Sequence, residues 1–99
     1  MNVFVLATAN LPSPWEHPVM ARRAVKYIEK LPGLVGVHPM YPQGTLLVFA
    51  TLPHAEKAKK RMQTDGIPAA NHIMRGTCER DNDGNLATLM VGEPVDGET

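Results

Sequence analysis

The sequence predicts an α+β domain, with strands and helices alternating along a chain of 99 residues. Two observations lead to this class. Residues 44–62 (GTLLVFATLPHAEKAKKRM) have the pattern of a strand followed directly by a basic helix. Within them, residues 45–51 are a continuous apolar run without alternation, which is typical of a strand covered on both faces. We therefore expect this strand near the centre of a sheet, with the other elements arranged around it.

Five segments have strand character, and their order sets the expected topology. Pro39 lies within the second of them, which places that strand at an edge of the sheet. A turn at residues 41–44 joins the second strand to the third as a hairpin. The predicted strands are residues 3–8, 34–40, 45–51, 69–78 and 86–91.

Two helices fill the gaps between these strands. Ser13 and Glu16 have capping-box spacing, with Pro14 at the first helical position. The alternative is a start at His17 or Pro18, because a proline one turn into the helix removes a hydrogen bond. The second helix follows Thr51 as its N-cap and ends at the Asp-Gly pair of residues 65–66. Each helix has one apolar face, as expected for helices that pack on a sheet.

The resulting order, β-α-β-β-α-β plus a fifth strand, is that of ferredoxin-like domains. Right-handed crossovers then give an antiparallel sheet of order 2-3-1-4, with the fifth strand beside strand four and both helices on one face. We expect a single domain over residues 1–91. Residues 92–99 are rich in Gly, Pro and acidic side chains, and we expect them to form a flexible acidic tail.

The bulk composition fits a soluble cytoplasmic protein. Hydrophobic residues make up 43% of the chain and charged residues 20%, which is ordinary for a globular domain. The single cysteine, Cys78, excludes an intrachain disulfide. The apolar N-terminal segment is too short for a membrane span, and it has no preceding basic residues that would make it a signal peptide. No membrane association is therefore expected.

Both parities of the two central strands are apolar. One set of side chains packs on the helices. The other set is also expected to be buried, because burying each large apolar side chain contributes roughly 1.5–3 kcal/mol to stability. Two sheets stacked face to face in a homodimer would bury it, and so would a C-terminal segment folded across the face. The candidate dimer-interface residues are Phe4, Leu6, Leu47 and Phe49.

Three loops share one end of the predicted sheet: the loop after strand one, the turn between strands two and three, and the loop before strand four. They gather aromatic and polar side chains of the kind that line small-ligand sites. Alternatively, the aromatic side chains close the end of the core. The candidate ligand-binding residues are Trp15, His17, His38, Tyr41 and Gln43.

The net charge of the chain is zero, but the charges are segregated. Residues 1–78 hold nine Lys and Arg against four Asp and Glu, whereas residues 79–99 hold one against six. The basic helices are either solvated faces or a surface for nucleic acid or another polyanion. The candidate polyanion-binding residues are Arg22, Arg23, Lys26, Lys30, Lys57, Lys59, Lys60 and Arg61.

No catalytic or metal-binding constellation is evident. Strand counting places His38 and His72 about 14 Å apart, too far to share one zinc ion. Ser13 is explained as a cap, and Cys78 is expected to be buried as a small apolar side chain. We therefore expect no metal and no cofactor, and we lean against an enzyme.

The leading hypothesis is a small binding or interaction domain that forms a homodimer through the open sheet face. Nucleic-acid or polyanion binding by the basic helices is the second. The third is a small-molecule-binding protein or an enzyme that uses the end of the sheet around Trp15, His17 and Tyr41.

Overall fold

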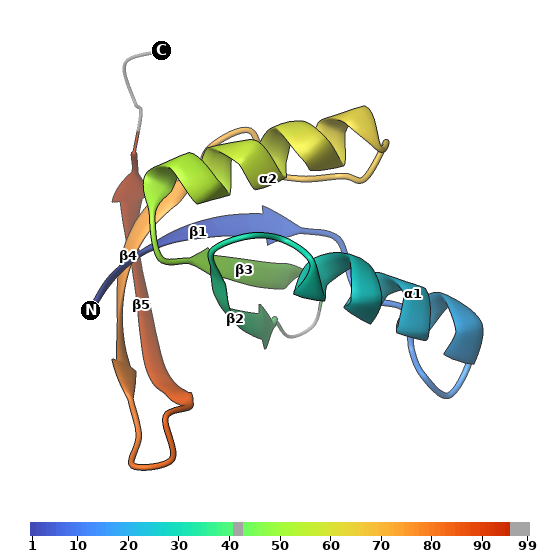
Figure 1. Ribbon diagram of the computed structural model, residues 1–99, viewed down its shortest axis with the longest axis horizontal. Helices are drawn as coiled ribbons and strands as arrows, with labels where there is room; N and C mark the ends of the chain where they lie inside the picture. Colours follow the sequence, from blue (N-terminus) through green and yellow to red (C-terminus); the bar gives the residue numbers. More distant parts are fainter. Residues whose placement is uncertain (41–42, 96–99) are drawn as a thin grey trace.

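The computed structural model describes residues 1–40 and 43–95. These residues form one antiparallel sheet of five strands, in the order β2-β3-β1-β4-β5, together with two helices (Figure 1). The α+β class, the number of strands and their order are confirmed. The elements are β1 (Asn2–Thr8), α1 (Pro18–Glu29), β2 (Leu34–Pro39), β3 (Thr45–Phe49), α2 (Leu52–Thr64), β4 (Met74–Arg80) and β5 (Leu86–Pro94).

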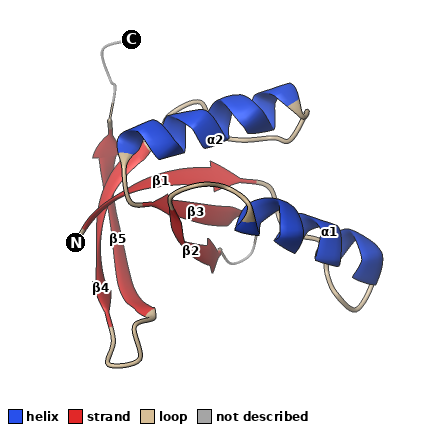
Figure 2. Cartoon of the chain, viewed as in Figure 1, coloured by secondary structure: helices blue, strands red, loops and turns tan. Residues whose placement is uncertain are grey.

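Each face of the sheet has its own apolar core. On one face, strand side chains pack against both helices, for example against Ile28 of α1 and Met62 of α2. The cluster on the other face is built around residues of β1, β3 and β4: Val3, Val5, Val48 and Cys78. The two helices therefore lie on the same side of the sheet (Figure 2).

The four residues assigned to a dimer interface belong to the helix-side core. Phe4 is half-buried, and the other three are fully buried within a single chain. Along β1 and β3 they alternate with the residues of the second cluster. Their side chains therefore point to the face of the sheet that the helices cover. This corrects the assignment of these side chains to the open face of the sheet. The residues concerned are Phe4, Leu6, Leu47 and Phe49.

The helix-free face is covered by the chain itself. The β4–β5 hairpin curls out of the plane of the sheet and runs steeply across the direction of β1 and β3 (Figure 1). Leu86 and Leu89 of β5 pack on the second core cluster, where Val5 and Val48 are 0% exposed. The apolar row opposite the helices is thus buried without a second subunit.

The curl brings the two edge strands of the sheet into contact. Leu86 of β5 lies so close to Gly36 of β2 that no room remains for a Cβ atom on Gly36. The hairpin bends at two register shifts in its ladder, one of them between Met74 and Gly76. At Gly76 a Cβ atom would lie 2.9 Å from the carbonyl oxygen of Met90, so this bend also requires glycine.

The starts of both helices follow their local sequence signals. α1 begins at Pro18, with His17 as N-cap, which is the later of the two expected starts. The Ser13 hydroxyl accepts hydrogen bonds from the backbone N–H groups of Trp15 at 3.2 Å and Glu16 at 3.4 Å, in a separate turn before the helix. α2 begins after Thr51, whose side chain accepts from the backbone N–H of His54, as predicted.

The C-terminal strands differ from the expected ranges. β4 begins at Met74 rather than at residue 69, because the chain bends at residues 71–72 and only Ala69 makes an isolated bridge, to Thr8. β5 continues to Pro94 rather than ending at residue 91, since the register shift in β4 lets Pro94 pair with Met74. The first part of the predicted tail is therefore strand, and residues 96–99 lie outside the described ranges.

The contact between Gly36 and Leu86 predicts a strong energetic coupling. Gly36→Ala is expected to lower the free energy of unfolding by about 1–3 kcal/mol, because the added methyl group meets the Leu86 side chain. In a Leu86→Ala background the same change is expected to cost less than about 0.5 kcal/mol, since the obstructing atoms are gone. Denaturant unfolding of the four proteins measures both costs. Equal costs in the two backgrounds would show that the edge strands do not meet.

Candidate functional site

Three segments meet at one end of the sheet, as the topology predicts. Thr8, at the end of β1, pairs with Thr45 at the start of β3 and bridges to Ala69 before β4. The side-chain oxygen of Asn10 accepts a hydrogen bond from the backbone N–H of Gly44 in the β2–β3 turn. The loop after β1 is therefore tied to both of its neighbours.

A cleft of about 300 Å³ opens at this end of the molecule. Its lining comes from the loop after β1, from α1, and from the C-terminal part of α2 with the segment that follows it. The lining is mostly apolar, with Leu11, Ile28, Met62 and Ile67 among the lining residues. The side chain of Arg23 supplies the positive charge of the lining.

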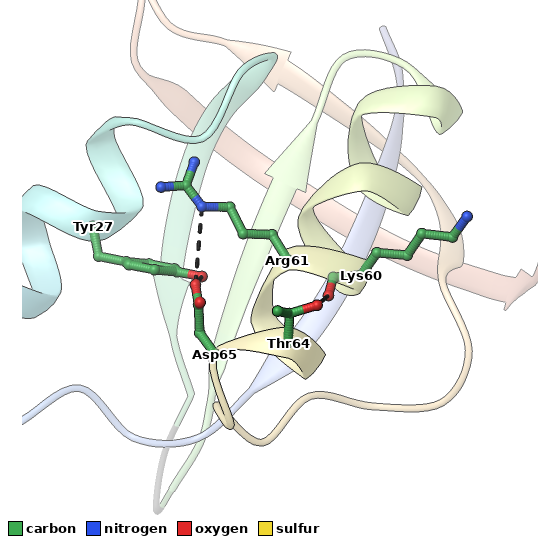
Figure 3. A network of polar contacts seen from close by, with 5 residues as sticks. All are labelled: Tyr27, Lys60, Arg61, Thr64 and Asp65. Atoms are coloured by element: carbon green, nitrogen blue, oxygen red, sulfur yellow. Dashed lines mark hydrogen bonds and ion pairs between the residues drawn. The ribbon is translucent and has the colours of Figure 1, made fainter.

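The Tyr27 side chain extends from α1 toward Arg61 and Asp65 at the end of α2 (Figure 3). Tyr27 is also one of the residues that line the cleft. Its hydroxyl donates a hydrogen bond to Asp65 Oδ2 at 2.6 Å, and the Arg61 guanidinium lies 5.2 Å from its ring centroid. Arg61 Nε also lies 4.0 Å from Asp65 Oδ2. Burial first, and then the hydrogen bond to Asp65, raises the pKa of the Tyr27 hydroxyl above its ordinary value of 10.0.

The described members of the predicted ligand-binding set do not line the cleft. Trp15 is 93% exposed, because the turn that begins at Ser13 carries it outward. His17 and Gln43 are exposed and His38 is half-buried. Tyr41 lies outside the described residues. Topology predicts that these loops meet at this end of the sheet, but it does not predict which side chains line the cleft.

The spacing of two residues on α1 is the sequence signal for part of the cleft lining. Arg23 and Tyr27 are four residues apart on α1, so they share one helix face. That face is turned toward the end of α2, where the Asp65 carboxylate accepts a hydrogen bond from the Tyr27 hydroxyl.

The opposite side of α1 carries a second, more exposed feature. A groove of about 450 Å³ runs along it, and Pro14 and Pro18 lie at its N-terminal end. The other lining residues include Arg22, Val25 and Glu29. α1 extends outward past the start of β3, so its first turns lie away from the sheet (Figure 1).

The predicted polyanion surface stays a prediction. Seven of its eight residues are exposed and one is half-buried. The Lys59 ammonium donates to the backbone oxygen of Asn71, and Arg61 is paired with Asp65. The residues lie on both helices: Arg22, Arg23, Lys26 and Lys30 on α1 or at its end, and Lys57, Lys59, Lys60 and Arg61 on α2.

Two further properties concern the described ranges alone. Within residues 1–40 and 43–95, no three His, Cys, Asp or Glu side chains come together in a way that could hold a metal ion. Neither helix in these ranges is long and apolar enough to cross a membrane. Cys78 is buried, as its sequence context predicts.

Comparison of the chain with protein-family models, with curated proteins and with solved structures finds no match. Function is therefore inferred from the geometry of the chain itself.

The raised pKa of Tyr27 predicts a loss of stability in alkali. The folded-state pKa lies above the unfolded value of 10.0, so the folded chain holds this proton more strongly. The resulting stabilisation is fully present below pH 10 and is lost as the pH rises through the folded-state pKa. Tyr27→Phe is expected to remove this alkaline loss and to lower the free energy of unfolding near neutral pH by about 0.5–1.5 kcal/mol.

Denaturant unfolding at neutral and alkaline pH measures both effects. Tyr41→Phe is the matched control, because it removes the other tyrosine of the chain and is expected to keep the alkaline loss. An alkaline loss that survives Tyr27→Phe unchanged would contradict the assignment.

Proposed function

We propose that the protein is a ferredoxin-like interaction domain that pairs with a second copy of itself through α1. The element order β-α-β-β-α-β and the strand order support the ferredoxin-like classification. The fifth strand is then an addition that closes the free face. One observation carries the functional proposal: exposed apolar side chains are concentrated on α1 and the loop before it.

These side chains are large and well exposed. Trp15 is 93% exposed, Met20 57%, Val19 50% and Val25 46%. Single exposed apolar residues are ordinary, but several together mark an interaction surface. Tryptophan is also among the residues that contribute most to binding energy at protein interfaces. Their concentration on α1 and the loop before it favours a contact made through this part of the molecule.

The groove side of α1 is complementary to itself when two copies are antiparallel. Pro18, Arg22, Val25 and Glu29 recur at intervals of four, three and four residues, the spacing of a packed helix seam. A two-fold axis near Val25 places Arg22 of each chain against Glu29 of the other. Among the described residues of one chain, neither Arg22 nor Glu29 makes an ion pair. The pairing therefore joins apolar contact at the centre with opposite charges on either side.

The groove along α1 is favoured over the helix-free face of the sheet as the dimerisation surface. The helix-free face is filled by Leu86 and Leu89 of the same chain, so it offers no uncovered core row. The groove of α1 lies on the outside of the molecule and includes Val25, which is 46% exposed. The homodimer expectation is thus kept, and its surface moves from the sheet to α1.

Val25→Lys is expected to weaken dimerisation at least tenfold, because it places two charges at the centre of a two-fold contact. Light scattering coupled to size exclusion, over a range of concentrations, measures the dissociation constant. Emission from Trp15, the single tryptophan, provides an independent signal of association. Val91→Lys is the matched control, since Val91 is 44% exposed but lies on β5.

Charge exchange tests the antiparallel geometry separately. Arg22→Glu and Glu29→Arg are each expected to weaken association about tenfold, and the double variant is expected to restore it. A wild-type chain that stays monomeric at high concentration would refute the proposal. Dimerisation that is insensitive to Val25→Lys would also refute it, by placing the contact elsewhere.

A further inference from the structure

The cleft between α1 and the loop after β1 has the size of a small-ligand site. Its volume of about 300 Å³ equals that of about ten water molecules in the liquid, which corresponds to a ligand of roughly ten non-hydrogen atoms. The lining combines Leu11, Ile28 and Met62 with the ring of Tyr27. An apolar body of this size therefore finds apolar contacts on several sides.

The wall around Tyr27 is fixed before any ligand arrives. The Tyr27 hydroxyl is bonded to Asp65, and the Arg61 guanidinium lies over the ring (Figure 3). The Asp65 carboxylate is thus engaged by a hydroxyl and by Arg61, 4.0 Å away, which reduces its repulsion of an anion nearby. Ligand binding on this side needs little side-chain ordering, so little affinity is lost to it.

The polar groups of the cleft leave one charge available. The Thr8 hydroxyl donates to the backbone oxygen of Pro68 at 2.6 Å, and the Asn10 side-chain oxygen accepts from Gly44. Among the described residues, the Arg23 guanidinium makes no hydrogen bond or ion pair, and its side chain is exposed. The cleft therefore offers apolar walls and a single free cation.

We propose that this cleft binds a small carboxylate with an apolar body. The guanidinium of Arg23 holds the carboxylate through paired N–H donors, and the body packs against Leu11, Met62 and the Tyr27 ring. A single guanidinium matches the single charge of a carboxylate, whereas a doubly charged phosphate calls for more cations than this cleft supplies. The site lies on the side of α1 opposite the groove that contains Val25, so it is independent of self-association.

The test uses phenylacetate, phenylacetamide and 2-phenylethylamine, which share a ring and differ in charge. Amide chemical shifts of the full chain are followed during titration with each compound. Phenylacetate is expected to bind in the millimolar range and to shift the amides of residues 8–11 and 23–28. It is expected to bind at least tenfold more tightly than the neutral amide, with the cationic amine weakest.

Variants distinguish the contribution of the Arg23 charge to binding from that of the apolar cleft. Arg23→Gln is expected to weaken phenylacetate binding about tenfold, and Arg23→Lys to recover part of that loss. Ala24→Leu is expected to abolish binding by filling the cleft. Lys57→Gln removes an exposed charge on α2 and is expected to leave binding unchanged.

Three results would overturn the proposal. The first is the absence of any shift at residues 8–11 and 23–28. The second is equal affinity for phenylacetate and phenylacetamide. The third is the same phenylacetate affinity in Arg23→Gln as in the unaltered chain. None of these depends on whether the chain dimerises.

Discussion

The structure depends on covering two central strands on both faces. Leu6 and Val5 are neighbours on β1 and point to opposite sides of the sheet, yet both are fully buried. The helices cover the side of Leu6, and the curled β4–β5 hairpin covers the side of Val5. The contact between Leu86 and Gly36 completes the second cover by joining the edges of the sheet. Without this cover, the apolar side chains on the helix-free face of the sheet would need a partner molecule to be buried.

Because the curled β4–β5 hairpin covers the helix-free side of the central strands, we place the interaction surfaces on the helices. α2 lies along the sheet and buries Ala55, Ala58 and Met62. α1 buries less and is tied to α2 by the Tyr27–Asp65 hydrogen bond. A helix held near its C-terminal end presents two separate sides. One side lines the cleft with Arg23, and the other carries the apolar groove proposed for self-association.

The candidate sites show how far sequence reasoning reaches. The meeting of three loops at one end of the sheet follows from strand order, and the Thr8–Thr45 and Thr8–Ala69 pairings bear it out. Side-chain direction in a loop does not follow from strand order. Trp15 is carried outward by a hydrogen-bonded turn at Ser13, so an aromatic expected near a pocket is 93% exposed. The cleft is lined instead by α1 and the apolar loop beside it.

The sequence by itself determined the elements and the strand order, because caps, proline positions and apolar periodicity act within a few residues of one another. Thr51 capping α2 and Pro18 opening α1 are of this kind. Only the tertiary structure decided which layer covers the second face. That outcome depends on a bend at Gly76 and on Leu86 meeting Gly36 from the far edge of the sheet. Apolar residues on both parities of a strand show that both faces must be buried, but they carry no information about the segment that covers the second face.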